Sequence, residues 1–235
     1  MLMLGAISNC YNKGEVENNG CGYAASDTNI GTAAGIAGAN QLGNVVNCYN
    51  KGTIKSLPSA EDQRGSIAGG VIGLNYGNIT NAYNEGSIIT NGNSYVTIGG
   101  IVAWEYSHTA NRYINYVYNI GKLNEEQSQN ENSVARGGVL GVSTSSKALW
   151  SNFFWLEGTG AIHSLGTATG EDPTKYTSEQ IKNLISSGSL LDTDWATDSN
   201  INNGYPHLKA FDDTNIWLRD SKNDGDPYLK ENLPQ

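Results

Sequence analysis

Copies of one stretch, Gly43-Asn44-Val45-Val46-Asn47-Cys48-Tyr49-Asn50-Lys51-Gly52-Thr53-Ile54, organise most of this chain. Related stretches begin at positions 5, 77, 112 and 148, and the last two are increasingly diverged. Successive copies therefore start 38, 34, 35 and 36 residues apart. A period in this range is typical of solenoids, propellers and other repeat arrays.

A second recurring stretch, of the form Gly-Gly-Ile-x-Gly, lies between copies of the first. Each period thus carries three short apolar segments, separated by turns that contain Gly and Asn. Short strands that each pair with their equivalent one period later describe a parallel β-helix. We therefore predict an all-β fold, a right-handed parallel β-helix of about five coils of roughly 36 residues each. The second stretch occupies residues 34–38, 69–73, 99–103 and 137–141.

Stacking of equivalent positions predicts ladders of like side chains. An asparagine ladder is expected at a bend, because Asn tolerates a left-handed backbone and can bond its neighbour in the next coil. An aromatic column would add about 0.5–1.5 kcal/mol per ring pair. Cys10 and Cys48 share a repeat position and are expected to act as small buried hydrophobes. The predicted ladders are Asn9, Asn47, Asn81 and Asn152, and Tyr11, Tyr49, Tyr83, Tyr118 and Phe154.

The repeat pattern ends near position 165, so we divide the chain into a β-helix over residues 1–165 and a small α+β capping segment over residues 166–235. Thr177 and Gln180 have the spacing of a capping box, which predicts one short helix that stops near Gly188. Because a solenoid end exposes unpaired strand edges, we expect the segment to cover that end. It also contains two similar Trp…Gly-x-Pro-x-Leu-Lys units, at residues 195–209 and 217–230.

Charge and composition exclude several classes of partner. The net charge of −9 leaves no basic stripe for nucleic acid or for an anionic membrane surface. No apolar run is long enough to predict membrane insertion. The three cysteines are an odd number and include no CxxC spacing, so neither a complete disulfide framework nor a metal site is predicted. No cofactor motif is present.

The chain begins inside a repeat and lacks the basic and apolar regions of a signal peptide. We therefore expect it to be part of a longer protein and monomeric as a fragment.

Catalytic motifs are absent from the sequence, and no catalytic residue is predicted. The histidines are isolated from one another, so there is no H-E-x-x-H zinc motif, and no G-x-S-x-G occurs. A β-helix polysaccharide hydrolase or lyase is the enzyme alternative, but it needs acidic or basic groups converging on one face. Lys51 and Glu85 stack at one repeat position, but as a surface ion pair they would contribute only about 0–1 kcal/mol. Carbohydrate binding would instead use exposed aromatic rings, and Trp104, Tyr106 and Trp150 are the candidate ligand contacts.

The combination of Gly-Gly-Ile-x-Gly with Ile-x-Asn-Cys-Tyr-Asn-x-Gly resembles the GLUG-type repeats of bacterial surface and secreted proteins. The run from Thr177 to Gly-Tyr-Pro-His-Leu-Lys at 204–209 is similar to the segment that commonly follows them. Such repeats occur in adhesin-like proteins and in the non-catalytic parts of IgA-specific metallopeptidases. The resemblance implies a β-helical fold and an extracellular or cell-surface bacterial setting.

From these observations we expect a non-catalytic module that serves as an adhesive surface or a structural stalk. Its partner would be a glycan or a protein of a host or cell surface. The alternatives are a carbohydrate-active β-helix enzyme and a substrate-positioning domain of a larger surface protease.

Overall fold

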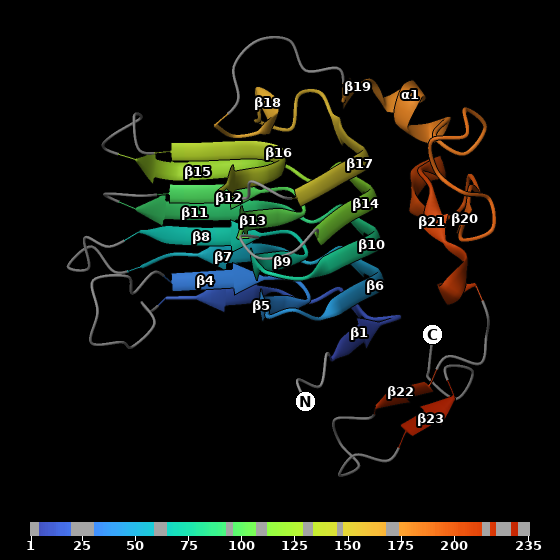
Figure 1. The fold of residues 1–235 in the computed structure, drawn as a ribbon, viewed down its shortest axis with the longest axis horizontal. Helices are drawn as coiled ribbons and strands as arrows, with labels where there is room; N and C mark the ends of the chain where they lie inside the picture. The colour runs from blue at the N-terminus through green and yellow to red at the C-terminus, as the bar shows by residue number, and fades with distance from the viewer. Residues whose placement is uncertain are drawn as a thin grey trace.

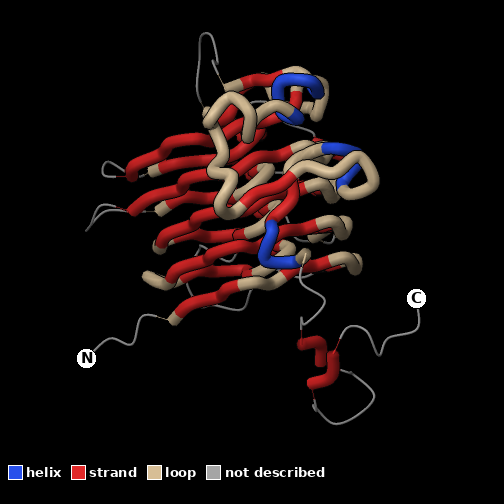
Figure 2. Tube along the Cα trace, turned by 90° about the vertical axis from the view of Figure 1, so that its right-hand side faces the viewer, coloured by secondary structure: helices blue, strands red, loops and turns tan. Residues whose placement is uncertain are grey.

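The computed structural model describes residues 5–19, 31–58, 65–92, 96–106, 112–128, 134–144, 148–167, 174–212, 217–219 and 227–229. Within these ranges, parallel strands stack in three sheets around a common core (Figure 1). Figure 2, turned by 90°, shows the strands lying one above another along the stack. The chain is thus an all-β parallel solenoid, which confirms the fold class predicted from the repeat period.

The first sheet holds the strand of the Asn-Cys-Tyr-Asn stretch from every turn. It has seven strands in the order β1-β6-β10-β14-β17-β19, and β2 pairs beside β1 on β6. Equivalent residues are in register, so Tyr49 pairs with Tyr83, and Tyr83 pairs with Tyr118. The strands are β1 (Ala6–Ser8), β2 (Tyr11–Asn12), β6 (Asn44–Asn50), β10 (Asn78–Asn84), β14 (Arg112–Asn119), β17 (Ala148–Leu156) and β19 (Lys175–Tyr176).

The second and third sheets complete each turn. The second is a single column of four strands, β3 (Val16–Asn18), β7 (Ile54–Ser56), β11 (Ile88–Gly92) and β15 (Leu123–Ser128). The third is bent into two columns that join at the long strand β16 (Val134–Ser143). One column holds β4 (Gly31–Ala34), β8 (Ser66–Gly69) and β12 (Val96–Gly99), and the other holds β5 (Ala37–Asn40), β9 (Ile72–Asn75) and β13 (Val102–Glu105). The last strand, β18 (His163–Leu165), pairs with β16 where the two columns join.

Four successive turns place a strand in all three sheets, whereas the fifth does not. After β17 the chain makes turns through Gly158 and Gly160, at φ +77° and +103°, instead of forming a strand of the second sheet. The carbonyl of Thr159 still accepts a hydrogen bond from Leu123 N at 2.7 Å. The expected five coils therefore count one turn too many as complete, since the last repeat copy carries turn glycines where a strand would lie.

A bend in the first sheet turns both ends of its strands toward the core. Asn9, Asn47, Asn81 and Asn152 occupy this bend with φ between 48° and 55°. In the fourth turn Tyr116 takes the same conformation at φ 55°. Because the left-handed residue resets the alternation, residues on both sides of it, such as Ile79 and Ala82, are fully buried in one cluster.

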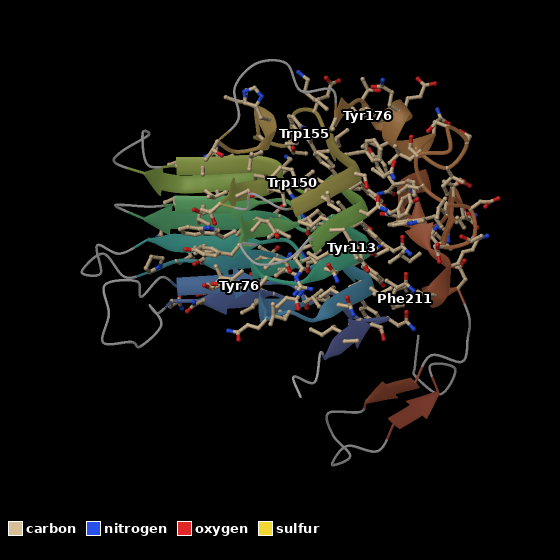
Figure 3. All side chains as sticks on the ribbon, viewed as in Figure 1. Tyr76, Tyr113, Trp150, Trp155, Tyr176 and Phe211 are labelled. Carbon is tan, nitrogen blue, oxygen red and sulfur yellow. The ribbon has the colours of Figure 1, made fainter. Side chains whose placement is uncertain are left out.

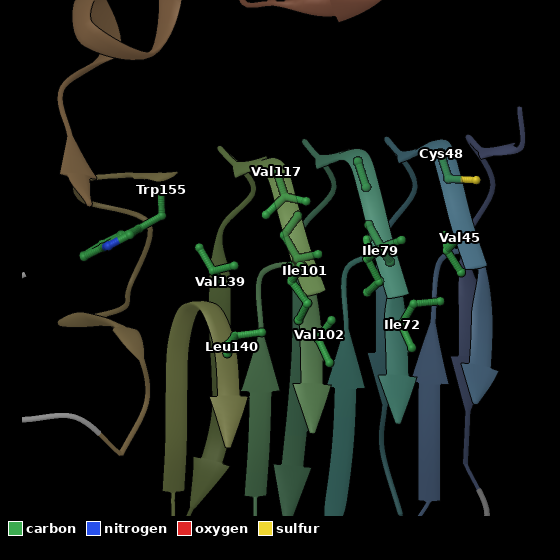
Figure 4. Close-up of a cluster of buried hydrophobic side chains, with 13 residues drawn as sticks. Val45, Cys48, Ile72, Ile79, Ile101, Val102, Val117, Val139, Leu140 and Trp155 are labelled. Carbon is green, nitrogen blue, oxygen red and sulfur yellow. The ribbon is translucent and has the colours of Figure 1, made fainter. Parts of the chain in front are cut away.

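The core is a column of branched apolar side chains from the first and third sheets (Figure 4). Cys48 belongs to it, and burial raises the pKa of its thiol to about 12, so the group stays protonated as a small hydrophobe. Cys10, at the equivalent position of the first turn, is exposed, and both thiols are free. Cys21 lies outside the described residues.

The C-terminal segment packs along the side of the solenoid (Figure 1), which differs from a cap confined to its end. It starts with β19 paired to β17, followed by helix α1 (Ser178–Lys182). Thr177 and Gln180 form the capping box at the start of this helix, and after it the chain continues in turns to Gly188 at φ +76°. The physical reason for the lateral position is the edge of the aromatic column, which offers a long apolar surface.

The two Trp…Gly-x-Pro-x-Leu-Lys units form antiparallel pairs with the same register. In β20 (Trp195–Ala196) and β21 (His207–Leu208), Trp195 lies opposite Leu208. In β22 (Trp217–Arg219) and β23 (Pro227–Leu229), Trp217 lies opposite Leu229. Two short 3-10 turns, Asn202–Gly204 and Lys209–Phe211, flank β21. In the described part of the chain no helix has the length and apolarity needed to cross a membrane.

Candidate ligand-binding site

The three aromatic residues predicted to contact a ligand do not form a single patch. Trp104 and Tyr106 lie together, with ring centroids 5.8 Å apart, and Tyr76 of the preceding turn joins them at 5.2 Å from Tyr106. All three are half-buried. Trp150 pairs with Ile114 in the first sheet and packs against the core, so it continues a core column (Figure 3). A ligand role for Trp104 and Tyr106 stays a prediction.

A buried carboxyl group lies next to this aromatic patch. Asn40 Nδ2 donates to Asn75 Oδ1 at 2.8 Å, and Asn75 Nδ2 donates to Glu105 Oε2 at 2.6 Å. Glu105 is completely buried, and its other oxygen accepts no hydrogen bond from the described residues. Desolvation raises the pKa of this carboxyl to about 7, against the opposing effect of the Asn75 hydrogen bond.

The tyrosines predicted to form an aromatic column are stacked face to face. Ring centroids are 5.2 Å apart for Tyr11 and Tyr49, 4.8 Å for Tyr49 and Tyr83, and 5.2 Å for Tyr83 and Tyr118. The interplanar angles are 13°, 8° and 6°. Phe154, paired with Tyr118, continues the column into the fifth turn, and its ring centroid lies 4.9 Å from that of Tyr176 in β19.

The C-terminal segment covers the edges of these rings. Trp195 lies 5.9 Å from Tyr83 and 5.7 Å from Tyr118, and its indole N–H donates to Asn81 Oδ1 at 3.2 Å. Further along the segment, Phe211 meets Tyr49 edge-on at 4.9 Å. Figure 3 shows Tyr176 and Phe211 at opposite ends of this contact. The segment therefore spans the column from its last turn to its first.

A cavity of about 280 Å³ remains between the segment and the first three turns. Its solenoid wall is made by the tyrosine column and two lysines that follow it in the repeat. Its other wall comes from β21 and the turns beside it. The lining residues are Tyr11, Lys13, Tyr49, Lys51, Tyr83, Ile201, His207, Leu208, Phe211 and Asp212.

Both lysines lie over tyrosine rings. Lys13 Nζ is 5.0 Å from the centroid of Tyr11, and Lys51 Nζ is 5.7 Å from that of Tyr49. Lys51 also pairs with Glu85 at 2.9 Å, and the Glu85 side chain is only 17% exposed. The pair is more buried than the surface contact that the sequence suggested. Desolvation raises the pKa of Glu85, and Lys51 opposes that effect.

The facing wall carries a histidine–aspartate pair. His207 Nε2 lies 3.0 Å from Asp212 Oδ1, while His207 Nδ1 is buried and bonds to none of the described residues. Burial raises the pKa values of Tyr49 and Tyr83 above the usual range of a phenol, so both hydroxyls stay neutral at physiological pH. The cavity can thus offer hydroxyl and ammonium groups to a ligand, while the His207 imidazole is buried and paired with Asp212. No group of three or more potential metal ligands occurs among the residues that the structure describes.

Asparagines also form rows along the stack. Asn47 Nδ2 donates to Asn9 Oδ1 at 3.2 Å, and Asn81 Nδ2 donates to Asn47 Oδ1 at 3.1 Å. Asn152 is separated from that row and donates to Asn115 at 3.0 Å. A second row, which was not identified from the sequence, consists of the Asn of each Tyr-Asn-x-Gly stretch. In it, Nδ2 of one Asn donates to Oδ1 of the next at 2.7–2.8 Å, through Asn12, Asn50, Asn84 and Asn119.

Sequence reasoning also did not find the cavity. A signal existed in Lys13 and Lys51, which share the repeat position two residues after the stacked tyrosine. The opposite wall comes from residues 201–212, whose place against the column no repeat spacing encodes.

One solved structure is similar to this chain. It is the crystal structure of a "putative immunoglobulin A1 protease" from Bacteroides ovatus, with a TM-score of 0.60 and 23% sequence identity. The similarity covers 88% of this chain and 58% of that chain, so the present chain spans less than two thirds of its length. No family model and no curated protein matches the sequence. At this level of identity the similarity shows a shared fold alone, that of the parallel β-solenoid.

Proposed function

We propose that the chain is a non-catalytic binding module of a bacterial cell-surface or secreted protein, which presents an adhesive surface to a glycan or protein. The observation that carries this proposal is the cavity beside the tyrosine column, where hydroxyl, ammonium and aromatic groups converge on one rigid scaffold. Pockets of this kind, with a few polar groups on an apolar frame, are typical of small-ligand sites.

The scaffold suits an adhesive or stalk role because side-chain hydrogen bonds link its turns to one another. Buried amide groups of Asn50, Asn84 and Asn119 bond one turn to the next. Each such bond contributes about 0.5–1.5 kcal/mol net and would cost more if left unmade. A stack held in this way keeps surface groups at fixed spacings.

The buried carboxyl groups support a non-catalytic role. Glycoside hydrolysis needs two carboxyl groups that flank one bond. Glu85 follows β10 of the first sheet and is paired with Lys51, whereas Glu105 ends β13 of the third sheet and is bonded to Asn75. The two groups thus lie on different sheets with separate partners.

A glycan-array screen of the purified chain, followed by an assay of reducing-end release on every hit, tests this proposal. We expect binding without release. A Trp104→Ala variant separates the aromatic patch on the third sheet from the cavity as the binding surface. Release of reducing ends in proportion to the concentration of the purified chain would instead establish the carbohydrate-active alternative.

A second candidate is a substrate-positioning domain of a larger surface protease. The fold similarity to the "putative immunoglobulin A1 protease" favours it. Surface plasmon resonance against immobilised immunoglobulin A1, with immunoglobulin G as the control, tests this role. Saturable binding to the first protein alone would support it, and equal signals on both would contradict it.

A further inference from the structure

We infer that the cavity between the tyrosine column and residues 201–212 binds an acidic sugar, a pyranose that carries a carboxylate. The inference rests on the proposed binding function and assigns to it a place and a ligand class. Three features of the cavity carry it: an ammonium group and a row of hydroxyl groups that are unpaired within the described residues, and apolar side chains on the facing wall.

The ammonium group belongs to Lys13. It is exposed and lies over the Tyr11 ring, and within the described residues it forms no ion pair. The neighbouring Lys51 is paired with Glu85. Lys13 is therefore the cation available to a ligand carboxylate, and a charge-assisted hydrogen bond of this kind is about twice as strong as a neutral one.

The hydroxyl row comes from the tyrosine column. Tyr118, in the fourth turn, has its hydroxyl occupied, because it accepts from Asn202 Nδ2 and donates to the carbonyl of Pro206. The hydroxyls of Tyr11, Tyr49 and Tyr83 bond to no described residue. Their rings are 5.2 and 4.8 Å apart, so the cavity presents donors and acceptors at a regular step along its length. A polyhydroxylated ring matches such a row better than an apolar ligand does.

The facing wall suits the carbon–hydrogen face of a sugar. Leu208 is buried, Phe211 is half-buried, and Ile201 is 41% exposed at the rim. His207 of the same wall is buried, and its Nδ1 bonds to none of the described residues. The volume of about 280 Å³ lies just below the usual range of ligand pockets, so the cavity would enclose one or two rings of a longer oligosaccharide.

The surrounding charge adds selectivity. The protein as a whole carries a net charge of −9, so an anion is repelled from most of its surface. Two lysines and one aspartate line the cavity, which makes it a local exception. Neutral glycans would lose the Lys13 contact, while sulfate or phosphate alone would leave the hydroxyl row unused.

Isothermal titration calorimetry with trigalacturonate, and with neutral galactotriose as the matched probe, tests this assignment on the intact chain. We expect the acidic trisaccharide to bind at least about tenfold more tightly than the neutral one, and the difference to shrink as salt rises. The variant Lys13→Gln should lower trigalacturonate affinity about tenfold. Lys122→Gln, which changes an exposed lysine of the fourth turn outside the cavity, should leave it unchanged.

Equal affinity for the two trisaccharides, unaltered binding by Lys13→Gln, or no binding of trigalacturonate would overturn the assignment. Circular dichroism of both variants shows whether the fold is intact. Tyr11→Phe, which removes one hydroxyl while keeping the ring, serves as a second probe, and we expect it to lower the affinity for trigalacturonate about threefold. Failure here is distinct from failure of the proposed function. Array hits that persist in Lys13→Gln and vanish in Trp104→Ala would keep the binding module and move its site to the third sheet.

Discussion

Two rows of stacked side chains, at two corners of the solenoid, bury polar groups that need hydrogen-bond partners, and they differ in how completely these partners are supplied. In the row Asn50, Asn84 and Asn119, successive amides bond to one another across the turns, and each donates to the carbonyl of the glycine two residues on. The row that starts with Asn40 and Asn75 instead ends on Glu105, and one oxygen of this carboxyl group bonds to none of the described residues. Where the asparagine repeats from turn to turn, the stacked amide groups satisfy one another's hydrogen bonds. Where Glu105 replaces it, the row ends on a buried carboxyl group that can titrate.

The largest effect is expected from breaking the satisfied row. Asn84→Ala removes the hydrogen bonds to Asn50, Asn119 and Gly86 in a fully buried place. At about 1–3 kcal/mol for each buried group left unpaired, we expect a loss of about 4 kcal/mol in the free energy of unfolding. Urea denaturation measures it. The matched change Asn78→Ala, in the same strand but half-exposed, should cost less than about 1 kcal/mol, and equal losses for the two would contradict the argument.

A somewhat smaller loss is expected from crowding the same row. A Cβ at Gly70 would lie 2.1 Å from the carbonyl oxygen of Gly100 and 2.6 Å from Cγ of Asn84. Neither neighbour is the free end of a side chain, so Gly70→Ala should destabilise the fold by about 3 kcal/mol. Gly38, in the equivalent stretch of the first turn, has nothing within 4 Å of such a Cβ. Thermal unfolding should therefore show Gly38→Ala within about 0.5 kcal/mol of the unchanged protein.

The unsatisfied row predicts a gain instead of a loss. Burial raises the folded-state pKa of Glu105 to about 7, above the value of 4.5 for the free side chain. The folded state therefore holds this proton more tightly, and its stability falls as pH rises from about 4.5 to about 7. Glu105→Gln should stabilise the protein by about 2 kcal/mol at pH 8 and by almost nothing at pH 4. Denaturation curves that shift equally at both pH values would show that the carboxyl is not the cause.

The smallest effect concerns the asparagine row at the bend of the first sheet, Asn9, Asn47 and Asn81, which ends on Trp195 of the C-terminal segment. Trp195→Phe keeps most of the ring packing on Tyr83 and Tyr118 but removes the indole N–H that bonds to Asn81. We expect a loss of about 1 kcal/mol, the usual net worth of one such bond. Chemical denaturation followed by far-ultraviolet circular dichroism measures this change, and an unchanged midpoint would show that Asn81 finds another donor.

The repeat spacing made the solenoid, its strands and the bend predictable. Asn47 was assignable to a bend because apolar residues on both sides of it had to face inward, and its φ is 53°. Asn84 was not recognised as a ladder residue, because the Asn84-Glu85-Gly86 stretch indicated only a turn. Its burial depends on the gap left by Gly70, which lies in the bend between β8 and β9 of the third sheet. Pairing between sheets of one turn is not visible in a period.

The candidate site was predictable in even smaller part. The sequence predicts Trp104, Tyr106 and Trp150 as exposed aromatic contacts; the structure brings the first two together, half-buried, and packs Trp150 against the core. Nothing in the sequence near His207 or Phe211 indicates that they face Tyr11 and Tyr49, which lie more than a hundred residues earlier. Contacts of that separation follow from how the last segment is laid along the stack.

That lateral segment has a consequence for how the molecule comes apart. A bare stack of turns can fray from either end, one turn at a time, since each turn contacts only its neighbours. Here Tyr176 holds the fifth turn, Trp195 the third and fourth, and Phe211 the first and second. Unfolding of the first turn therefore requires that Phe211, near the other end of the sequence, lose its contacts with Tyr11 and Tyr49. Fraying of the stack thus becomes a concerted event. Under a pulling force, a module held in this way would unfold cooperatively, in one abrupt step.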